Sequence, residues 1–336
     1  MNITASIVIL TKNSMGIIQR LVQALIEQDF ALPYEVIFMD NSSGDGTVDF
    51  LKSTPFPHKR VINVAEGEFS HSGTRMKAAA AAKGDIVIFF TDDIIPIGPS
   101  FLTELTRPVL EKRASAAYGV WQIDEKSCDP IDAFLHNDWY HGFDDITEPI
   151  SRFCWDKFPP QLRRRLCNFD NCSSCIDRKL LLELKFPAVP YGEDMLFAKQ
   201  LILNGHAIAM CKNARFYHWH KVSFGYLLRR MCIDQHLSIP EFGIYYVRRK
   251  LGVIKAILIR VLQRTWVAFF KLKIPFAKKI LWTVYNIKIL TADFIGKYMG
   301  VLNDESIKGF SPVNKKLLKR KNEIIDVIYK KSILRY

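Results

Sequence analysis

Two short clusters, one of acidic and one of imidazole side chains, have residue types that could each bind a divalent cation. Asp92 and Asp93 follow the apolar run 86–90, and a carboxylate at a strand end can hold such a cation against a diphosphate. His218 and His220 are two residues apart, so in an extended segment both project from one face and can reach one ion. Mg²⁺ prefers oxygen ligands, whereas Mn²⁺ accepts more nitrogen. Each cluster also has a purely structural explanation, as solvated, capping or core side chains.

Two further segments could act on a substrate from the start of a helix. Glu193 and Asp194 begin an apolar segment, where helix amides and the helix dipole favour an ionised carboxylate that is ready to accept a proton. Residues 68–75 end in Arg75, and their amides and guanidinium could bind phosphate oxygens at a helix N-terminus. Helix capping is the alternative for both segments.

The elements that must position these side chains follow from the apolar pattern. Continuous apolar runs at 6–10, 35–39 and 85–90 predict buried strands, and 17–28, 75–82 and 193–204 have helical character. Strands that alternate with helices favour a mainly parallel sheet that is covered on both faces. Ligands bind such sheets beyond the carboxyl ends of the strands, which is where the polar residues gather.

The polar clusters occur in a recognisable order along the chain. Residues 40–47, 69–75, 91–96, 192–194 and 217–220 together resemble the family-two glycosyltransferases, particularly the bacterial rhamnosyltransferase branch. The resemblance covers about residues 5–235. It implies an α/β fold of the GT-A class, which is Rossmann-like, with a mainly parallel sheet flanked by helices. It also implies an inverting, metal-dependent sugar transfer.

The resemblance assigns the donor side of the site to residues of the N-terminal half. Thr11, Asn13 and Asp40 fall where the family holds the nucleoside, and Arg75 falls where it contacts the diphosphate. Asp92 is placed with these nucleotide-sugar-binding residues, at a position where the branch often has Gln.

The resemblance places the metal and the acceptor chemistry on the remaining clusters. Asp93 matches the metal-binding aspartate, and His218 and His220 match late histidines that complete the site for Mg²⁺ or Mn²⁺. Asp194 matches the catalytic base, with Glu193 as an acceptor contact. Two departures from the family pattern, Lys12 beside Asn13 and Met76 after Arg75, leave the sugar and the nucleotide open.

The seven cysteines do not indicate a disulfide framework or a zinc site. Their number is odd, and no signal peptide precedes them, so reduced thiols in a cytosolic protein are expected. Cys172 and Cys175 form one Cys-x-x-Cys pair without a second pair, which disfavours zinc. They are interpreted as small packing residues.

The positive charge of the chain lies in its C-terminal part. The net charge is +13, but residues 245–336 alone hold 21 Lys/Arg against 5 Asp/Glu, so the preceding part is slightly acidic. The sequence therefore predicts a catalytic domain over 1–235 and a basic helical membrane-association region over 236–336. No stretch of about 18 residues is apolar and uncharged, so no membrane span is expected.

Residues 253–273 are expected to form a basic amphipathic helix that ends or kinks before Pro275, followed by a second basic and apolar stretch over 276–300. Aromatic residues between basic ones favour an anionic membrane surface over a solvated helix packed on the catalytic domain, and nucleic acid is not expected as a partner. The expected basic face holds Arg260, Arg264 and Lys271, and the expected apolar face holds Ile259, Leu262, Trp266, Phe269 and Phe270.

The resulting hypothesis is an enzyme at the cytoplasmic face of the cell membrane, associated with it peripherally. It would transfer a sugar, by resemblance rhamnose from dTDP-rhamnose, to a lipid-linked glycan in the synthesis of a surface polysaccharide such as O-antigen. One alternative is a UDP-hexose-dependent glycosyltransferase of the same fold. The other is a non-enzymatic peripheral membrane-binding protein, in which the carboxylates only cap helices.

Overall fold

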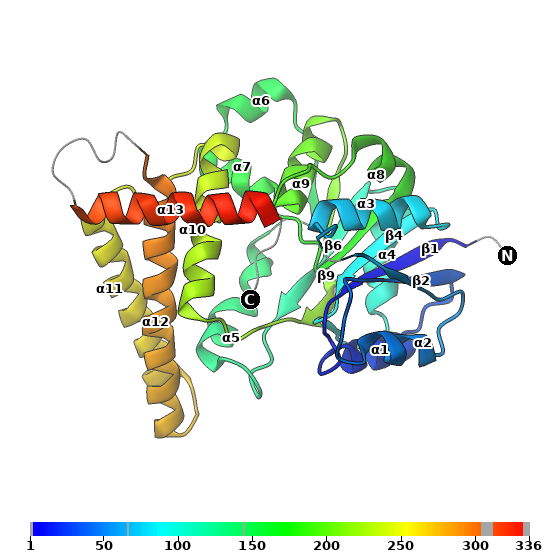
Figure 1. The fold of residues 1–336 in the computed structure, drawn as a ribbon, viewed down its shortest axis with the longest axis horizontal. Coiled ribbons are helices and arrows are strands. Elements are labelled where there is room, and N and C mark those ends of the chain that lie inside the picture. Colours follow the sequence, from blue (N-terminus) through cyan, green and yellow to red (C-terminus); the bar gives the residue numbers. More distant parts are fainter. Residues whose placement is uncertain (1–2, 66, 144, 304–311, 332–336) are drawn as a thin grey trace.

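A mixed β-sheet lies at the centre of the N-terminal part and is covered by helices on both faces (Figure 1). The computed structural model describes residues 3–65, 67–143, 145–303 and 312–331. In these residues the strand order is β3-β2-β1-β4-β8-β6-β9-β5, and β7 pairs with β9. The strands are β1 Ala5–Thr11, β2 Tyr34–Asp40, β3 Arg60–Asn63, β4 Ile86–Thr91, β5 Ile95–Pro96, β6 Ala116–Gln122, β7 Ile146–Thr147, β8 Ser173–Asp177 and β9 Ile208–Tyr217.

The strand directions change across the sheet. The β3-β2-β1-β4 half is parallel, as the apolar runs predict, and its register places Thr11 beside Asp40 and Leu10 beside Thr91. The carboxyl ends of β1, β2 and β4 therefore meet at one edge. Strand β8 enters antiparallel between β4 and β6, so the sheet as a whole is mixed. The predicted α/β class, with helices on both faces of a sheet, is confirmed, but the sheet is mixed rather than mainly parallel, because a fully buried apolar run does not reveal the direction of its strand.

Successive side chains of each strand point to opposite faces of the sheet and pack into two hydrophobic cores, one on each face. In β1, Ile7 and Ile9 pack with one core and Val8 and Leu10 with the other. Helices α1 Ile18–Ile26, α2 Thr47–Ser53 and α4 Phe101–Leu110 cover the first core, and α3 His71–Ala81, α8 Arg178–Leu184 and α9 Glu193–Leu203 cover the second. Between them lie α5 Pro130–His136, the 3₁₀ turn Trp139–Gly142, α6 Arg152–Lys157 and α7 Pro160–Leu166.

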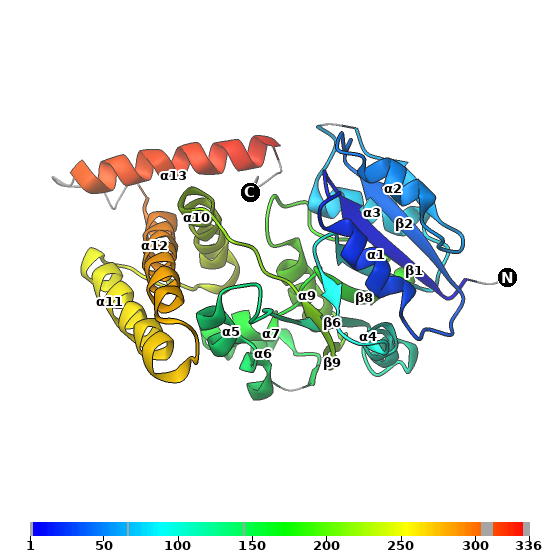
Figure 2. The same cartoon turned by 90° about the horizontal axis from the view of Figure 1, so that it is seen from below.

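The C-terminal part is helical, as predicted. It contains α10 Phe224–Phe242, α11 Lys250–Trp266, the π-helical turn Val267–Lys271, α12 Phe276–Val301 and α13 Pro312–Lys331. Figures 1 and 2 show α10, α11 and α12 side by side, with α13 crossing over them. Pro275 immediately precedes α12, and the preceding helical segment ends at Lys271, as Pro275 predicts. The proposed boundary at residue 235 falls inside α10.

Among the helices that the structure describes, none combines the length and the apolar character needed to cross a membrane.

Two glycines of α12 allow a close approach to α10. A Cβ atom at Gly300 would lie 2.5 Å from the carbonyl oxygen of Cys232, and one at Gly296 would lie 2.5 Å from that of Leu228. Both glycines are buried, and a methyl group there would meet backbone atoms that cannot rotate away. The interface between α10 and α12 therefore depends on the absence of side chains at these two positions.

We expect Gly300→Ala to lower the free energy of unfolding by about 1–3 kcal/mol, because the added methyl group pushes α12 away from α10. Urea unfolding followed by circular dichroism measures this change. Gly225→Ala is the matched control, because the nearest atom there is Nη1 of the flexible Arg229 side chain at 3.5 Å. It should be neutral or stabilising by up to about 1 kcal/mol. Equal stabilities of the two variants would contradict the close contact.

Candidate active site

The ends of β1 and β2 carry a hydrogen-bonded group of buried side chains. The hydroxyl of Thr11 donates to Asp40 Oδ1 over 2.9 Å, and the backbone N–H of Ser43 donates to Asp40 Oδ2 over 2.8 Å. Both Thr11 and Asp40 are buried. Asn13 lies at the exposed rim, where its Oδ1 accepts from the N–H of Gly44 over 2.9 Å. The three residues predicted to hold a nucleoside therefore lie together and order the loop after β2.

Asp92 lies beside this group, tied to the loop after β1. Its Oδ2 accepts from the hydroxyl of Ser14 and from the N–H of Lys12, the latter at 3.4 Å. Burial raises the pKa of Asp92 to about 6, because the Ser14 hydrogen bond compensates only in part and the charge of Asp93 opposes ionisation. Ser14 lies in an ordinary polar loop of the sequence, and only the structure shows its contact with Asp92.

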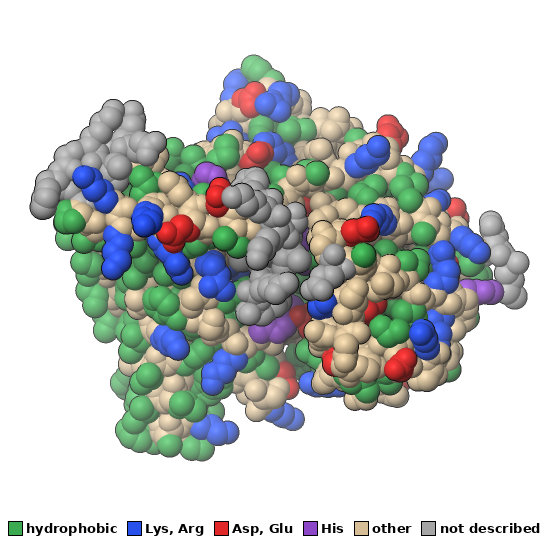
Figure 3. All heavy atoms as spheres, viewed as in Figure 1, with side chains coloured by type: hydrophobic (Ala, Val, Ile, Leu, Met, Phe, Trp, Pro, Cys, Tyr) green, Lys and Arg blue, Asp and Glu red, His purple; other side chains and the backbone are tan. Residues whose placement is uncertain are grey.

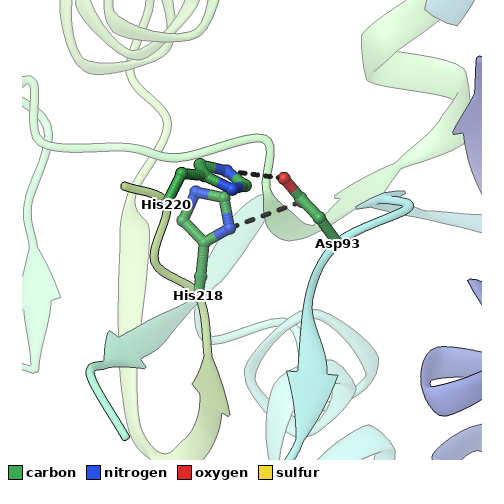
Figure 4. A group of neighbouring side chains, drawn as sticks. All are labelled: Asp93, His218 and His220. Atoms are coloured by element: carbon green, nitrogen blue, oxygen red, sulfur yellow. Dashed lines mark ion pairs between the residues drawn. The ribbon is translucent and has the colours of Figure 1, made fainter. Parts of the chain in front are cut away.

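Asp93, His218 and His220 converge at the edge of the site (Figure 4). His220 Nε2 lies 2.8 Å from Asp93 Oδ2, and His218 Nδ1 lies 3.4 Å from Asp93 Oδ1. Asp93 follows β4, whereas both histidines follow β9, where the N–H of His218 donates to the carbonyl of Gln122 over 3.0 Å. The structure thus brings together three residues that the sequence predicted as one metal site.

Within this cluster, the pKa values of Asp93 and His218 are each shifted by the other residue. Burial would raise the pKa of Asp93, but its contacts with His218 and His220 outweigh burial and lower it well below the usual range. Burial would lower the pKa of His218, but the hydrogen bond and charge of Asp93 raise it. The carboxylate is therefore held ionised and ready to ligate a cation.

The donor set fits a divalent cation. One ligand atom from each of the three side chains can be chosen so that all lie within 4.8 Å of one another. Asp93 Oδ1 and His218 Nδ1 are buried and face each other over 3.4 Å, which is longer than an ordinary N–H···O hydrogen bond. One carboxylate with two imidazoles matches Mn²⁺ better than Mg²⁺, because Mg²⁺ prefers oxygen ligands.

Asp194 is the second residue of α9 and is only partly accessible. Its Oδ1 lies 2.7 Å from the N–H of Met195, and its Oδ2 lies 3.5 Å from the N–H of Asn171. Burial, followed by the charges of Glu193 and Asp170, raises the pKa of Asp194 to about 7. A carboxylate with a pKa near neutrality is suited to accept a proton from a substrate hydroxyl.

Asp170 and Asn171 belong to this site although the sequence analysis missed them. They immediately precede β8, which lies beside β4 in the sheet. An acidic residue and an amide residue just before a buried strand can indicate a functional site. The same pair is also common in ordinary turns, so the pattern alone does not single them out.

Arg75 and Glu193 form a buried ion pair. Arg75 Nη1 lies 2.6 Å from Glu193 Oε1, and the two side chains are only 3% and 9% exposed. The resemblance assigns Arg75 to the diphosphate and Glu193 to the acceptor. In the structure the two side chains instead form an ion pair with each other. Arg75 Nε remains buried without a hydrogen-bond partner among the described residues, so a second donor of the guanidinium is available.

Removing one member of this pair should strongly destabilise the fold. We expect Arg75→Met to lower the free energy of unfolding by about 3–5 kcal/mol, because the Glu193 carboxylate is left buried and uncompensated. The double variant Arg75→Met/Glu193→Gln should recover part of the loss. Urea unfolding of the wild type, both single variants and the double variant measures the coupling, and strictly additive single-variant losses would show that the two side chains do not interact.

The cysteines near the site, one half-buried and one buried, pack against the core rather than forming a zinc site. Cys175 lies in a core, and Cys172 Sγ lies 3.9 Å from His218 Nε2. Burial raises the pKa of both thiols well above the usual value, which favours neutral sulfur over the thiolate that zinc requires. This agrees with the interpretation of both residues as small packing residues.

Comparison with known proteins places the N-terminal half in one family. Residues 6–167 match the sequence profile described as Glycosyl transferase family 2. The O-antigen chain rhamnosyltransferase WbaN of Salmonella anatum is 28% identical over 191 residues, which cover 56% of this chain and 57% of that protein. The O-antigen chain rhamnosyltransferase RfbN of Salmonella typhimurium is 26% identical over 198 residues, covering 58% and 60%. The chain thus spans less than two thirds of the length of these curated relatives.

Solved structures share the fold at lower identity. S. aureus TarS, as its fragment 1–349, superposes with a TM-score of 0.50 at 18% identity and covers 98% of this chain and 90% of that one. The mannosyltransferase PcManGT from Pyrobaculum calidifontis, solved in complex with GDP-Man and Mn²⁺, gives a TM-score of 0.53 at 16% identity, covering 87% and 86%. These similarities are evidence for a common fold.

Proposed function

Residues 6–167 are a glycosyltransferase family 2 domain, and from this premise we propose that the protein transfers a sugar from a nucleoside diphosphate sugar to an acceptor hydroxyl. One observation carries the proposal: a carboxylate with a pKa of about 7, Asp194, and a cation-binding cluster, Asp93 with His218 and His220, occur in one GT-A-like domain. The first suits proton removal and the second suits a diphosphate leaving group.

In the proposed reaction Asp194 accepts the proton of the acceptor hydroxyl. The acceptor oxygen forms a bond to the anomeric carbon, while the bond from that carbon to the diphosphate oxygen breaks on the opposite face. The electron pair of the broken bond leaves with the nucleoside diphosphate, and the configuration at the anomeric carbon is inverted. A single displacement needs no nucleophilic side chain and no covalent intermediate, unlike the two-step route of a retaining enzyme.

Asp93, His218 and His220 would hold Mn²⁺ or Mg²⁺ in this reaction. A bound divalent cation would supply positive charge that neutralises the departing diphosphate. The resemblance also places Arg75 at the diphosphate, where its buried Nε could donate a charge-assisted hydrogen bond while Nη1 stays with Glu193. That PcManGT was solved with GDP-Man and Mn²⁺ supports a metal in this role.

For the donor we propose dTDP-rhamnose, with Thr11, Asn13, Asp40 and Asp92 on the nucleotide side. The support is the resemblance and the two relatives, both named O-antigen chain rhamnosyltransferases. A UDP-hexose is the alternative, which the departure from the family pattern at Lys12 leaves open; Lys12 Nζ donates to the carbonyl of Asn41 over 2.6 Å beside the proposed nucleoside site.

For the acceptor we propose a lipid-linked glycan at the cytoplasmic face of the cell membrane, with the protein associated peripherally and the product used in surface polysaccharide. The names of the same relatives, which refer to the O-antigen chain, support the surface-polysaccharide part of this assignment. The division into a catalytic region over 1–235 and a membrane-association region over 236–336 belongs to the same proposal, and nucleic acid is not expected as a partner.

The deciding experiment measures thermal stabilisation of the protein by dTDP, UDP and GDP compounds, with and without Mn²⁺ or Mg²⁺. A ligand that binds the folded state must raise Tm. We expect a metal-dependent rise with dTDP-rhamnose, and a larger rise with a UDP-hexose would favour the alternative donor. No rise with any nucleotide would favour the non-enzymatic alternative.

A further inference from the structure

Helix α11 turns a charged residue toward the protein and an apolar stripe toward solvent. Arg264 pairs with Asp132 of α5 and also donates to Asn286 of α12, and its side chain is only 21% exposed. By contrast, Leu258 and Leu262 are 57% and 69% exposed. A helix that only covered the catalytic domain would have the opposite orientation, because burial of leucine drives packing.

The apolar stripe continues around the turn into α12. In Figures 1 and 2 the two helices lie side by side, and Figure 3 shows hydrophobic side chains gathered over the part of the molecule that they form. We name the set the α11–α12 apolar surface; its members range from 41% to 79% exposed. It consists of Leu251, Ile254, Leu258, Ile259, Leu262, Trp266, Phe270, Phe276, Ile280, Leu281, Val284 and Ile287.

The segments that form this surface carry charge of a single sign. Between Glu241 and Asp293 the sequence contains no acidic residue. Basic side chains with high exposure lie among the apolar ones, and their long stems can extend from an apolar layer to phosphate groups. They are Lys255, Arg260, Lys271, Lys273, Lys278 and Lys288.

These features favour one occupant over its competitors. A second copy in a two-fold dimer would bring the same lysines together without an acidic partner. Nucleic acid would meet the positive charge, but it would leave the leucine stripe without an apolar contact. An anionic bilayer offers both an apolar layer and phosphate groups at its boundary.

The α11–α12 apolar surface is fixed to the catalytic domain. Asn286 Nδ2 donates to Asp129 Oδ2 over 2.7 Å, and Asp129 also caps α5. Val267 and Ala268 of the π-helical turn are buried against Ile131 of α5. A membrane that bound this surface would therefore set the position of the catalytic domain relative to the bilayer.

We propose that the α11–α12 apolar surface inserts into the interface of an anionic phospholipid bilayer, with its apolar side chains below the headgroups and its lysines among the phosphates. This deepens the proposed function, since it names the surface that would hold the enzyme beside a lipid-linked acceptor, but it does not depend on which sugar is transferred.

The test is flotation of the full chain with vesicles of phosphatidylcholine alone or with about one third phosphatidylglycerol, at physiological salt. We expect the wild type to float with the anionic vesicles. Leu258→Glu/Leu262→Glu should lower the bound fraction at least about tenfold, since it places charge in the apolar layer. Phe153→Glu is the matched control: Phe153 is 70% exposed but lies on α6, and its variant should bind as the wild type does.

A second variant tests the charge. Lys255→Gln/Lys273→Gln/Lys288→Gln should lose most of the preference for anionic over neutral vesicles, because each removed charge weakens attraction to the headgroups. Far-ultraviolet circular dichroism and the Tm of each variant verify that it folds.

Several results would overturn the proposal. The proposal is wrong if the wild-type protein does not float with the anionic vesicles. It is also wrong if Leu258→Glu/Leu262→Glu binds these vesicles as well as the wild type does. A wild-type dimer in light scattering that this variant converts to a monomer would instead assign the surface to contacts between copies. The two proposals can fail separately. If the protein binds vesicles but no nucleotide raises its Tm, only the proposed enzymatic function is refuted. If a nucleotide raises Tm but the protein does not bind vesicles, only the proposed membrane-binding surface is refuted.

Discussion

Replacing Asp194 by Asn is expected to lower kcat at least about a thousandfold while the affinity for the donor stays within about twofold. The amide is nearly isosteric but cannot accept the proton of the acceptor hydroxyl. Initial rates with dTDP-rhamnose or a UDP-hexose measure the loss, and the nucleotide-induced rise in Tm measures donor binding. An Asn variant with near-normal turnover would remove Asp194 from the mechanism.

The pH dependence of the activity is a second test of Asp194 as the catalytic base. Because a base acts only when ionised, kcat/KM of the wild type should rise with pH up to about 7, the pKa of Asp194, and level off above it. The residual activity of the Asn variant should lack this rise. A wild-type profile that is flat between about pH 5 and pH 8 would contradict a base with this pKa.

Stability separates a structural effect of the substitution from a catalytic one. The folded-state pKa of Asp194, about 7, exceeds its ordinary value of 3.8, so the protonated carboxyl contributes stability that is lost as the pH rises through about 7. The neutral Asn should therefore raise Tm by about 2–4 °C near pH 8, and the difference should shrink toward pH 4. A variant that is inactive and also less stable at pH 8 would instead indicate misfolding.

Replacing Asp93 by Ala is expected to abolish the metal-dependent part of donor binding and to lower kcat/KM by at least about a hundredfold. Asp93 supplies the carboxylate of the cluster, with His220 Nε2 at 2.8 Å and His218 Nδ1 at 3.4 Å. Two imidazoles alone bind Mg²⁺ or Mn²⁺ weakly, because these cations need oxygen ligands. Titration of Tm with Mn²⁺ at fixed nucleotide measures the change.

The neighbouring acid provides the control. Asp92 accepts from Ser14 and the N–H of Lys12, so Asp92→Asn should keep the Mn²⁺-dependent rise in Tm. His218→Ala and His220→Ala then rank the two imidazoles, which the sequence left unranked. If Asp93→Ala retained the full Mn²⁺ response, the cation would have to bind elsewhere, and the cluster would be only an ion pair.

The sequence by itself determined the elements and the chemistry of the separate clusters. The apolar runs at 6–10, 35–39 and 85–90 became β1, β2 and β4, because a strand covered on both faces is continuously apolar. The family resemblance predicted Asp93 and the two histidines as one site, and the structure brings them together. Pro275 marked the break before α12, because proline cannot continue the preceding helix.

Only the tertiary structure decided which side chains become partners. Arg75 and Glu193 are 118 positions apart, and their ion pair exists because α3 and α9 cover the same face of the sheet. The same holds for Asp170, whose charge helps raise the pKa of Asp194. The helical periodicity of the sequence also predicted a basic face and an apolar face for α11, but it did not show which face is exposed to solvent. Contacts with α5 and α12 decide that orientation, and pattern alone cannot specify contacts between segments far apart in the chain.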